Sequence, residues 1–215
     1  TTLKTTKTAL TLNVDNITNA VVLDGSAAIT TLTINANGEA SDFNLTAAAV
    51  TSLTVAAAAD LDISTGSTLT AVKTVTITGA GDVNLGNLSA SASFATLNAS
   101  AATGDITVEI DGTVTAVTTG SGNDTITLTN AAAISKAINL GAGDDTLILA
   151  AGTTAIPTAA VNGGAGTDTI SMTFTSAASY DDAELFKNAI SGFERLEINN
   201  TYGVDGNTLD TLTLD

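Results

Sequence analysis

Short segments in which apolar and polar residues alternate recur along the chain at nearly constant spacing. Segments 29–38 (ITTLTINANG), 50–59 (VTSLTVAAAA) and 72–81 (VKTVTITGAG) align, with equivalent positions 21 or 22 residues apart, and weaker copies follow at 94–103 and 114–123. Leu, Val and Ile fall on one face of each segment and Thr or Ser on the other. A period of two with one apolar face predicts β-strands that are buried on one side.

Each of these segments continues, after a turn, into a second short apolar strand. The second strands are predicted at 43–45, 61–63, 83–85, 106–110 and 126–128. A unit of two short strands cannot bury its own apolar side, but stacked units share a continuous core. We therefore predict an all-β chain that forms a parallel β-helix or β-solenoid, similar to a β-roll, with coils of about 21 residues.

The alternation is interrupted near the end of the chain by a segment with helical spacing. Residues 179–193 (SYDDAELFKNAISGF) predict one short helix centred on 181–191. Ser179 is the expected N-cap and Gly192 the expected stop. The expected apolar face of this helix consists of Leu185, Phe186, Ala189 and Ile190.

Strand alternation resumes after this helix, at 193–198 and at 209–215. We expect two regions on this basis. Residues 1–175 form the solenoid, and residues 176–215 form a helical insertion with terminal strands that cap or continue it.

Composition and charge narrow the range of functions. The chain has 22 acidic and 6 basic residues, a net charge of −16, and no His, Cys or Trp. Nucleic-acid binding requires basic patches, so nucleic acid is not expected as a partner. The lack of Cys excludes disulfides and thiolate metal sites. No apolar run is long enough to span a bilayer, and no transmembrane segment is expected.

One phrase of glycines and aspartates occurs in three clear copies. These are TGSGNDTIT (119–127), LGAGDDTLI (140–148) and GGAGTDTIS (163–171), and their aspartates Asp124, Asp145 and Asp168 stand 21 and 23 residues apart. The spacing matches the coil, so the three turns should stack. Phrases of this form, G-G-x-G-x-D followed by a short strand, are typical of calcium-binding parallel β-helix repeats.

The chemistry of the phrase fits a hard divalent cation. Glycines let main-chain carbonyls approach a ligand, and Ca²⁺ takes six to eight oxygens from carbonyls and carboxylates. Two stacked turns can complete a shell that one turn cannot. Like charges one rung apart repel by about 3–4 kcal/mol at an effective dielectric of 20. Calcium binding is therefore expected to be coupled to folding.

A metal-free interpretation stays open, in which these are ordinary Gly-Asp turns. We favour that interpretation upstream, at Asp42, Asp60, Asp82 and Asp105, which lack either the paired glycines or an aspartate in the matching position. Segment 202–210 (YGVDGNTLD) is a further candidate for a separate ion, through Asp205, Asn207 and Asp210.

The three phrases resemble the RTX (repeat-in-toxin) family of calcium-loaded β-rolls, which Gram-negative bacteria export by type I secretion. The resemblance covers 119–171. It implies that carbonyls at the first, third and fifth positions and the carboxylate at the sixth hold calcium. The implied ligands are Thr119, Ser121, Asn123 and Asp124; Leu140, Ala142, Asp144 and Asp145; Gly163, Ala165, Thr167 and Asp168. Thr119 and Leu140 replace the first glycine of the pattern.

The wider Thr- and Ala-rich composition resembles the surface-layer (S-layer) proteins of bacteria such as Caulobacter and Campylobacter. Segment 190–198 (ISGFERLEI) is also similar to segments that recur in them. This resemblance implies a secreted protein of the cell surface that forms a two-dimensional lattice with copies of itself. It further implies attachment to outer-membrane lipopolysaccharide through another region.

Three other functions are alternatives to a structural role in a surface layer. A calcium-dependent RTX adhesin segment is the nearest alternative. An enzyme acting on polysaccharide is disfavoured, because the chain has no His or Cys, one Arg (Arg195) and few aromatics. An ice-binding solenoid is suggested by Thr31/Thr33 and Thr74/Thr76, but the threonine pattern fails at Asn98 and Ala116.

Overall fold

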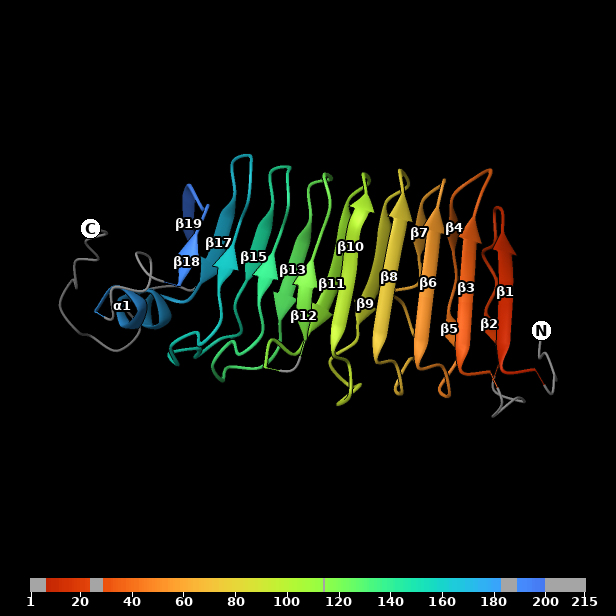
Figure 1. The fold of residues 1–215 in the computed structure, drawn as a ribbon, viewed down its shortest axis with the longest axis horizontal. Coiled ribbons are helices and arrows are strands. Elements are labelled where there is room, and N and C mark those ends of the chain that lie inside the picture. The colour runs from red at the N-terminus through yellow and green to blue at the C-terminus, as the bar shows by residue number, and fades with distance from the viewer. Residues whose placement is uncertain (1–6, 24–28, 114, 183–188, 200–215) are drawn as a thin grey trace.

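The chain folds into a rod of stacked coils in which every paired strand is parallel. A computed structural model describes residues 7–23, 29–113, 115–182 and 189–199. It confirms the predicted all-β solenoid. Figure 1 shows the strands side by side along the rod, with the N-terminal coils at one end and the C-terminal coils at the other.

Two long parallel sheets form the main faces of the rod. The first has nine strands: β1 (Ala9–Val14), β3 (Thr31–Ala36), β6 (Ser52–Ala57), β8 (Thr74–Gly79), β10 (Thr96–Ala102), β12 (Ala116–Thr118), β14 (Ile138–Asn139), β16 (Val161–Asn162) and β18 (Ile190–Ser191). The second has eight: β4 (Ser41–Asp42), β7 (Leu61–Asp62), β9 (Val83–Asn87), β11 (Ile106–Ile110), β13 (Thr125–Leu128), β15 (Thr146–Ile148), β17 (Thr169–Met172) and β19 (Arg195–Ile198). A third, short pairing joins β2 (Val21–Val22) to β5 (Leu45–Thr46).

The register of the nine-stranded sheet explains the repeat seen in the sequence. Ile34 pairs with Val55 and Val55 with Ile77, as the alternation predicts. One file of apolar residues runs across all nine strands. It consists of Leu10, Leu32, Leu53, Val75, Leu97, Val117, Ile138, Val161 and Ile190. Apart from the half-buried Leu10, these side chains are buried, so the core is continuous along the rod.

The single helix in the described residues lies earlier than the sequence predicted. Helix α1 spans Phe174–Asp182. Its N-cap is Thr173, whose Oγ1 accepts a hydrogen bond from the Ser176 amide at 3.3 Å. Ser179, the expected cap, lies inside the helix and donates to the Thr175 carbonyl at 3.0 Å.

The expected end of the helix is also wrong. Ile190 was assigned to its apolar face but belongs to β18, which pairs with β16 and places Ile190 in the core. Burial on the stack therefore outweighs helical spacing at this position. Leu185 and Phe186 lie outside the described residues, as does the predicted strand at 209–215. Strand β19 pairs with β17, so a further coil follows the helix.

Candidate functional site

The three glycine-aspartate phrases form consecutive turns at one edge of the rod. Turn 119–124 joins β12 to β13, turn 140–145 joins β14 to β15, and turn 163–168 joins β16 to β17. Their strands are neighbours in both sheets, so the turns stack. Ala142 and Ala165, at the third position of two copies, form a parallel bridge. The structure thus brings the three predicted turns together at the upper edge of the rod in Figure 1.

Glycines at the second and fourth positions make this stacking possible. A Cβ on Gly141 or Gly164 would overlap the carbonyl oxygen of the corresponding glycine one coil earlier. At the fourth position Gly143 has a φ of +129°, which L side chains rarely adopt, and a Cβ there would overlap the Gly122 carbonyl oxygen. The backbones therefore approach more closely than any side chain would allow.

The aspartates of the three phrases form a buried column, here called the inner column. Asp124, Asp145 and Asp168 are 0–1% exposed. The Oδ1 of each accepts a backbone N–H from the preceding coil: Asp145 from Asp124 at 2.7 Å and Asp168 from Asp145 at 2.8 Å. Asp124 accepts likewise from Ile106 at 2.8 Å. One oxygen of each carboxyl group thus links two coils.

The same column is apolar further towards the N-terminus. Leu61 pairs with Val83 and Val83 with Ile106, all of them buried. Asp124 directly precedes Thr125, which pairs with Thr107, so Asp124 occupies the position that Ile106 takes one coil earlier. The inner column therefore changes from aliphatic to acidic where the phrases begin.

The second oxygen of each buried aspartate has no hydrogen-bond partner. Asp124 Oδ2, Asp145 Oδ2 and Asp168 Oδ2 are the buried side-chain atoms without a partner in the described part of the chain. A buried acceptor without a partner costs about 1–3 kcal/mol, and more when charged. A cation, an ordered water or a proton on the carboxyl group would each supply the missing interaction.

Burial strongly affects the protonation of this column. It raises the pKa of Asp145 to about 7, and the charges of Asp124, Asp168 and Asp144 add to the rise, against the amide bond from Asp124. Burial likewise raises the pKa of Asp124. The Ile106 amide bonded to its Oδ1 opposes this rise, as do the Thr119 hydroxyl and the Gly120 amide, which lie near the carboxyl group without completing a hydrogen bond to Oδ2. Burial, with the charges of Glu194 and Asp144, raises the pKa of Asp168. Without a cation, Asp145 at the centre of the column takes up a proton near neutral pH.

The fifth positions of the phrases belong to a second file, here called the outer column, whose members are exposed or half-buried. Its members are Asp60, Asp82, Asp105, Asn123, Asp144 and Thr167. Here the amide of each residue after Asp60 donates to the side-chain oxygen one coil earlier, at 2.6–2.9 Å. The hydrogen bonds of the outer column therefore run in the opposite direction to those of the inner column. This column needs no buried partner, because its remaining oxygens face solvent.

Several of the predicted carbonyl ligands already accept hydrogen bonds. The Leu140 carbonyl accepts from the Thr119 hydroxyl at 2.5 Å, and the Ala165 carbonyl accepts from the Gly143 amide at 2.9 Å. A carbonyl oxygen has two lone pairs, so such a bond leaves one for a cation. Among the described residues, no three acidic side chains form a ready metal cluster. A cation here would therefore need carbonyl oxygens as well as the aspartates.

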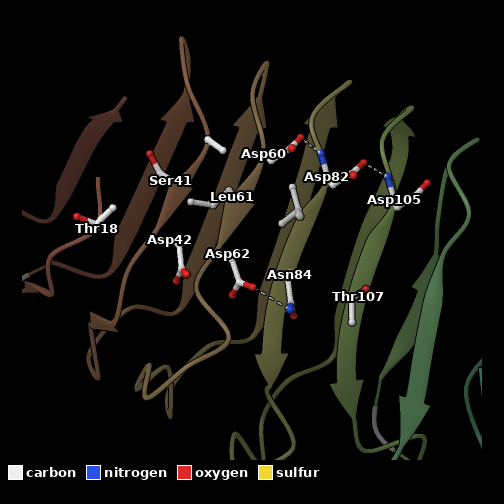
Figure 2. A pocket seen from close by; sticks show the side chains of 12 residues that line it. Thr18, Ser41, Asp42, Asp60, Leu61, Asp62, Asp82, Asn84, Asp105 and Thr107 are labelled. Atoms are coloured by element: carbon white, nitrogen blue, oxygen red, sulfur yellow. Dashed lines mark hydrogen bonds between the residues drawn. The ribbon is translucent and has the colours of Figure 1, made fainter. Parts of the chain in front are cut away.

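The upstream aspartates line a shallow groove of about 420 Å³ on the N-terminal coils. Figure 2 shows Asp42, Asp62 and Asn84 on successive strands, and Asp60, Asp82 and Asp105 at the adjoining turns. The carboxylates of Asp60, Asp82 and Asp105 each accept an amide of the following coil, and the Asn84 side-chain amide donates to Asp62 at 3.2 Å. None of the upstream aspartates is in the inner column, and the interpretation of these turns as metal-free stays a prediction.

One residue of this region was not anticipated from the sequence. The Oε2 of Glu194 accepts the Asp168 amide at 2.8 Å, the role that each aspartate plays for the coil before it. Glu194 directly precedes β19, as Asp168 precedes β17. Only the strand register reveals this equivalence, because the turn before Glu194 lacks the phrase. The candidates Asp205, Asn207 and Asp210 lie outside the described residues.

Comparison of the chain with protein-family models, with curated proteins and with solved structures found no match. No helix in the described residues has the length and apolarity needed to cross a membrane. The functional argument therefore rests on the geometry of the turns.

Proposed function

We propose that this chain is a structural module whose stacked turns bind Ca²⁺ between neighbouring coils. The observation that carries the proposal is the inner column, in which three buried carboxyl groups each have one oxygen without a partner. Calcium would offset the repulsion between these charges and supply the missing interaction, so that binding stabilises this part of the rod.

Oxygen chemistry supports calcium over softer metals. The chain has no His or Cys, which Zn²⁺ and Cu ions prefer. Ca²⁺ accepts carboxylates together with carbonyls in a flexible shell, and the turns offer both. The proposed ligands are the carboxylates of Asp124, Asp145 and Asp168, with carbonyl oxygens of the first, third and fifth positions of each phrase.

We further propose that the module belongs to a secreted bacterial cell-surface protein that assembles into an S-layer lattice. Support comes from the repetitive rod, the resemblance of the turns to RTX repeats, the acidic composition and the scarcity of catalytic side chains. Copies of the chain are the proposed partners, with lipopolysaccharide contacted through another region. An adhesin segment would use the same turns, and regular assembly on addition of calcium distinguishes the lattice.

Asp145→Asn is the variant that tests calcium binding. The amide side chain keeps an oxygen for the Asp124 amide but removes the central charge. We expect Ca²⁺ to raise the melting temperature of the natural chain, and we expect Asp145→Asn to lose more than about half of that rise. Circular dichroism melts in EDTA and in millimolar Ca²⁺ measure both effects.

Asp82→Asn is the matched control. Asp82 is an exposed member of the outer column and accepts the Asp105 amide at 2.8 Å, so its variant should keep the full response to calcium. If EDTA and Ca²⁺ give the same melting curve for the natural chain, the calcium proposal is wrong.

Threonines on the nine-stranded sheet favour ice binding as a second candidate. Thr11, Thr33, Thr54 and Thr76 pair in register, beside a parallel file of Thr31, Ser52, Thr74 and Thr96. The first file is interrupted at Asn98, which pairs with Thr76. Thermal hysteresis of the purified chain would support this candidate; normal growth of ice crystals in its presence would remove it.

A further inference from the structure

The last coil repeats the inner column with a glutamate. Asp168 accepts the Asp145 amide through Oδ1 at 2.8 Å, and Glu194 accepts the Asp168 amide through Oε2 at 2.8 Å. The Glu194 amide donates in turn to the Asp168 carbonyl at 3.0 Å. A fourth carboxylate thus continues the column, although the turn before it, Gly192–Phe193–Glu194, is shorter than the three phrases.

Two oxygens lie close together between Asp168 and this last coil. A Cβ on Gly163 would overlap the Gly192 carbonyl oxygen and lie 2.9 Å from Asp168 Oδ2. Those two oxygens therefore lie close to one another, near enough for one cation to contact both, and they can do so because residue 163 has no side chain. Gly192, with a φ of +67°, turns the chain so that its carbonyl reaches this position.

The unpartnered oxygens point to the same place. Two cations, one between each pair of neighbouring phrases, would occupy the gaps between Asp124 and Asp145 and between Asp145 and Asp168. Asp168 Oδ2 is buried, has no partner and lies beside the Gly192 carbonyl of the following coil. Its position is explained by a ligand in the next gap, between Asp168 and Glu194.

The opposite end of the column has no equivalent. Before Asp124 the inner column holds the buried Ile106, whose side chain offers no ligand. The column is therefore asymmetric, with an aliphatic residue at its N-terminal end and an exposed carboxylate at its C-terminal end.

We propose a third divalent-cation site, between the last phrase and the final coil, held by Asp168 Oδ2, the Gly192 carbonyl and the Glu194 carboxylate. The inference rests on the proposed function, because it extends the same column by one gap. Since Glu194 is exposed, water completes the shell on that side and the site exchanges its ion more readily than the other two. Ca²⁺ is the expected ion, as its ligands are all oxygens.

Calcium stoichiometry of the whole chain tests the third site. Native mass spectrometry and isothermal titration with Ca²⁺ should give three ions for the natural chain and two for Glu194→Gln. Glutamine keeps an oxygen for the Asp168 amide, so the fold is retained. Loss of groups that merely support a metal ligand already costs on the order of 10–100-fold in affinity, so we expect at least about a tenfold loss at this one site.

Glu197→Gln is the control, since Glu197 is an exposed residue of the same coil that pairs with Ser171 and lies outside the column. It should bind three ions. Two ions in both the natural chain and Glu194→Gln would overturn the third site and leave the proposed function standing. Binding of no ion by any form would overturn both. Equal stoichiometry and affinity in the natural chain and Glu194→Gln would also reject the role of Glu194.

Discussion

Individual carboxyl groups in this chain differ sharply in their surroundings. Asp111 accepts hydrogen bonds from the Thr113 hydroxyl and amide and from Asn130. Burial acts to raise its pKa, but these bonds together outweigh it and hold the pKa below the ordinary value. Asp145 is fully buried, accepts one amide hydrogen bond and has acidic neighbours. The effect of burial therefore outweighs that of the hydrogen bond, and the pKa of Asp145 is raised. The first group prefers to be charged in the folded state and the second prefers to be protonated.

The stability of the calcium-free chain should therefore fall as pH rises from about 4 to about 7. Between the unfolded pKa of 3.8 and the folded pKa of about 7, Asp145 holds a proton in the folded state only. Each such group lowers the free energy of unfolding by about 1.4 kcal/mol per pH unit. Urea unfolding in EDTA at several pH values measures the slope. Asp111 contributes fully above pH 4, so it does not alter this window.

Calcium should reverse this dependence, because protons and the cation compete for the same carboxylates. In millimolar Ca²⁺ we expect stability to increase from pH 5 to pH 7. Asp145→Asn should flatten the slope in EDTA. A slope that is the same with and without Ca²⁺ would contradict the competition.

Some residues of the candidate site were predictable from the sequence, and others were not. Asp124, Asp145 and Asp168 are identifiable from the repeated phrase, and the structure places them in one column. Their protein partners were not predictable, because each side chain bonds to an amide about 20 residues away, in the preceding coil. Glu194 was missed for the same reason: its role follows from strand register and not from any local motif.

Among the elements, the turns are the most constrained parts of the rod. Parallel strands in successive coils need only alternation, and so their existence was predictable from Leu, Val and Ile at period two. The turns at the second and fourth phrase positions instead require glycine, because backbone atoms of the adjacent coil occupy the place of a Cβ. The helix was misplaced because Thr173 is its N-cap in place of Ser179, and because Ile190 is buried on the stack.

Two glycine substitutions distinguish the energetic cost of steric crowding from that of backbone strain. Gly152→Ala changes a glycine with a φ of +80° and no atom within 4 Å of the added Cβ, so about 1–2 kcal/mol of strain is expected. Gly143→Ala adds a clash with the Gly122 carbonyl and should cost more than about 3 kcal/mol. Chemical unfolding in Ca²⁺ compares the two variants. Equal losses would show that the turns do not pack as described.

At the scale of the whole molecule, each coil contacts only its neighbours. Strand pairing in both sheets follows chain order from coil to coil, without exception among the described strands. The free energy of unfolding of such a stack is approximately the sum of the intrinsic stabilities of the coils and of the interfaces between neighbouring coils. One end can therefore unfold while the other end stays folded. Under the proposed function, we expect the apolar inner column of the N-terminal coils to be stable without ions and the acidic column to depend on them.

Chelation should therefore affect the two parts of the rod differently. In EDTA at pH 8 we expect amides of β13, β15 and β17 to exchange with deuterium at least about tenfold faster than in Ca²⁺. The reason is that the free energy of local opening there is lower without the cation. Amides of β3, β6 and β8 should show no change. Hydrogen exchange read by mass spectrometry gives both regions in one experiment, and uniform acceleration along the chain would argue against the division.

The inner column also has a genetic consequence. Segment 78–83 (TGAGDV) already has both glycines and the fifth-position aspartate of the phrase, and Val83 occupies the column. Two of the four valine codons become aspartate codons by a single base change, and the other two become glutamate codons. One point mutation could therefore replace the aliphatic inner-column residue of a coil with an acidic one, without changing the length of the repeat. In a solenoid of this design, ordinary base substitutions could add or remove an ion-dependent turn in one coil at a time.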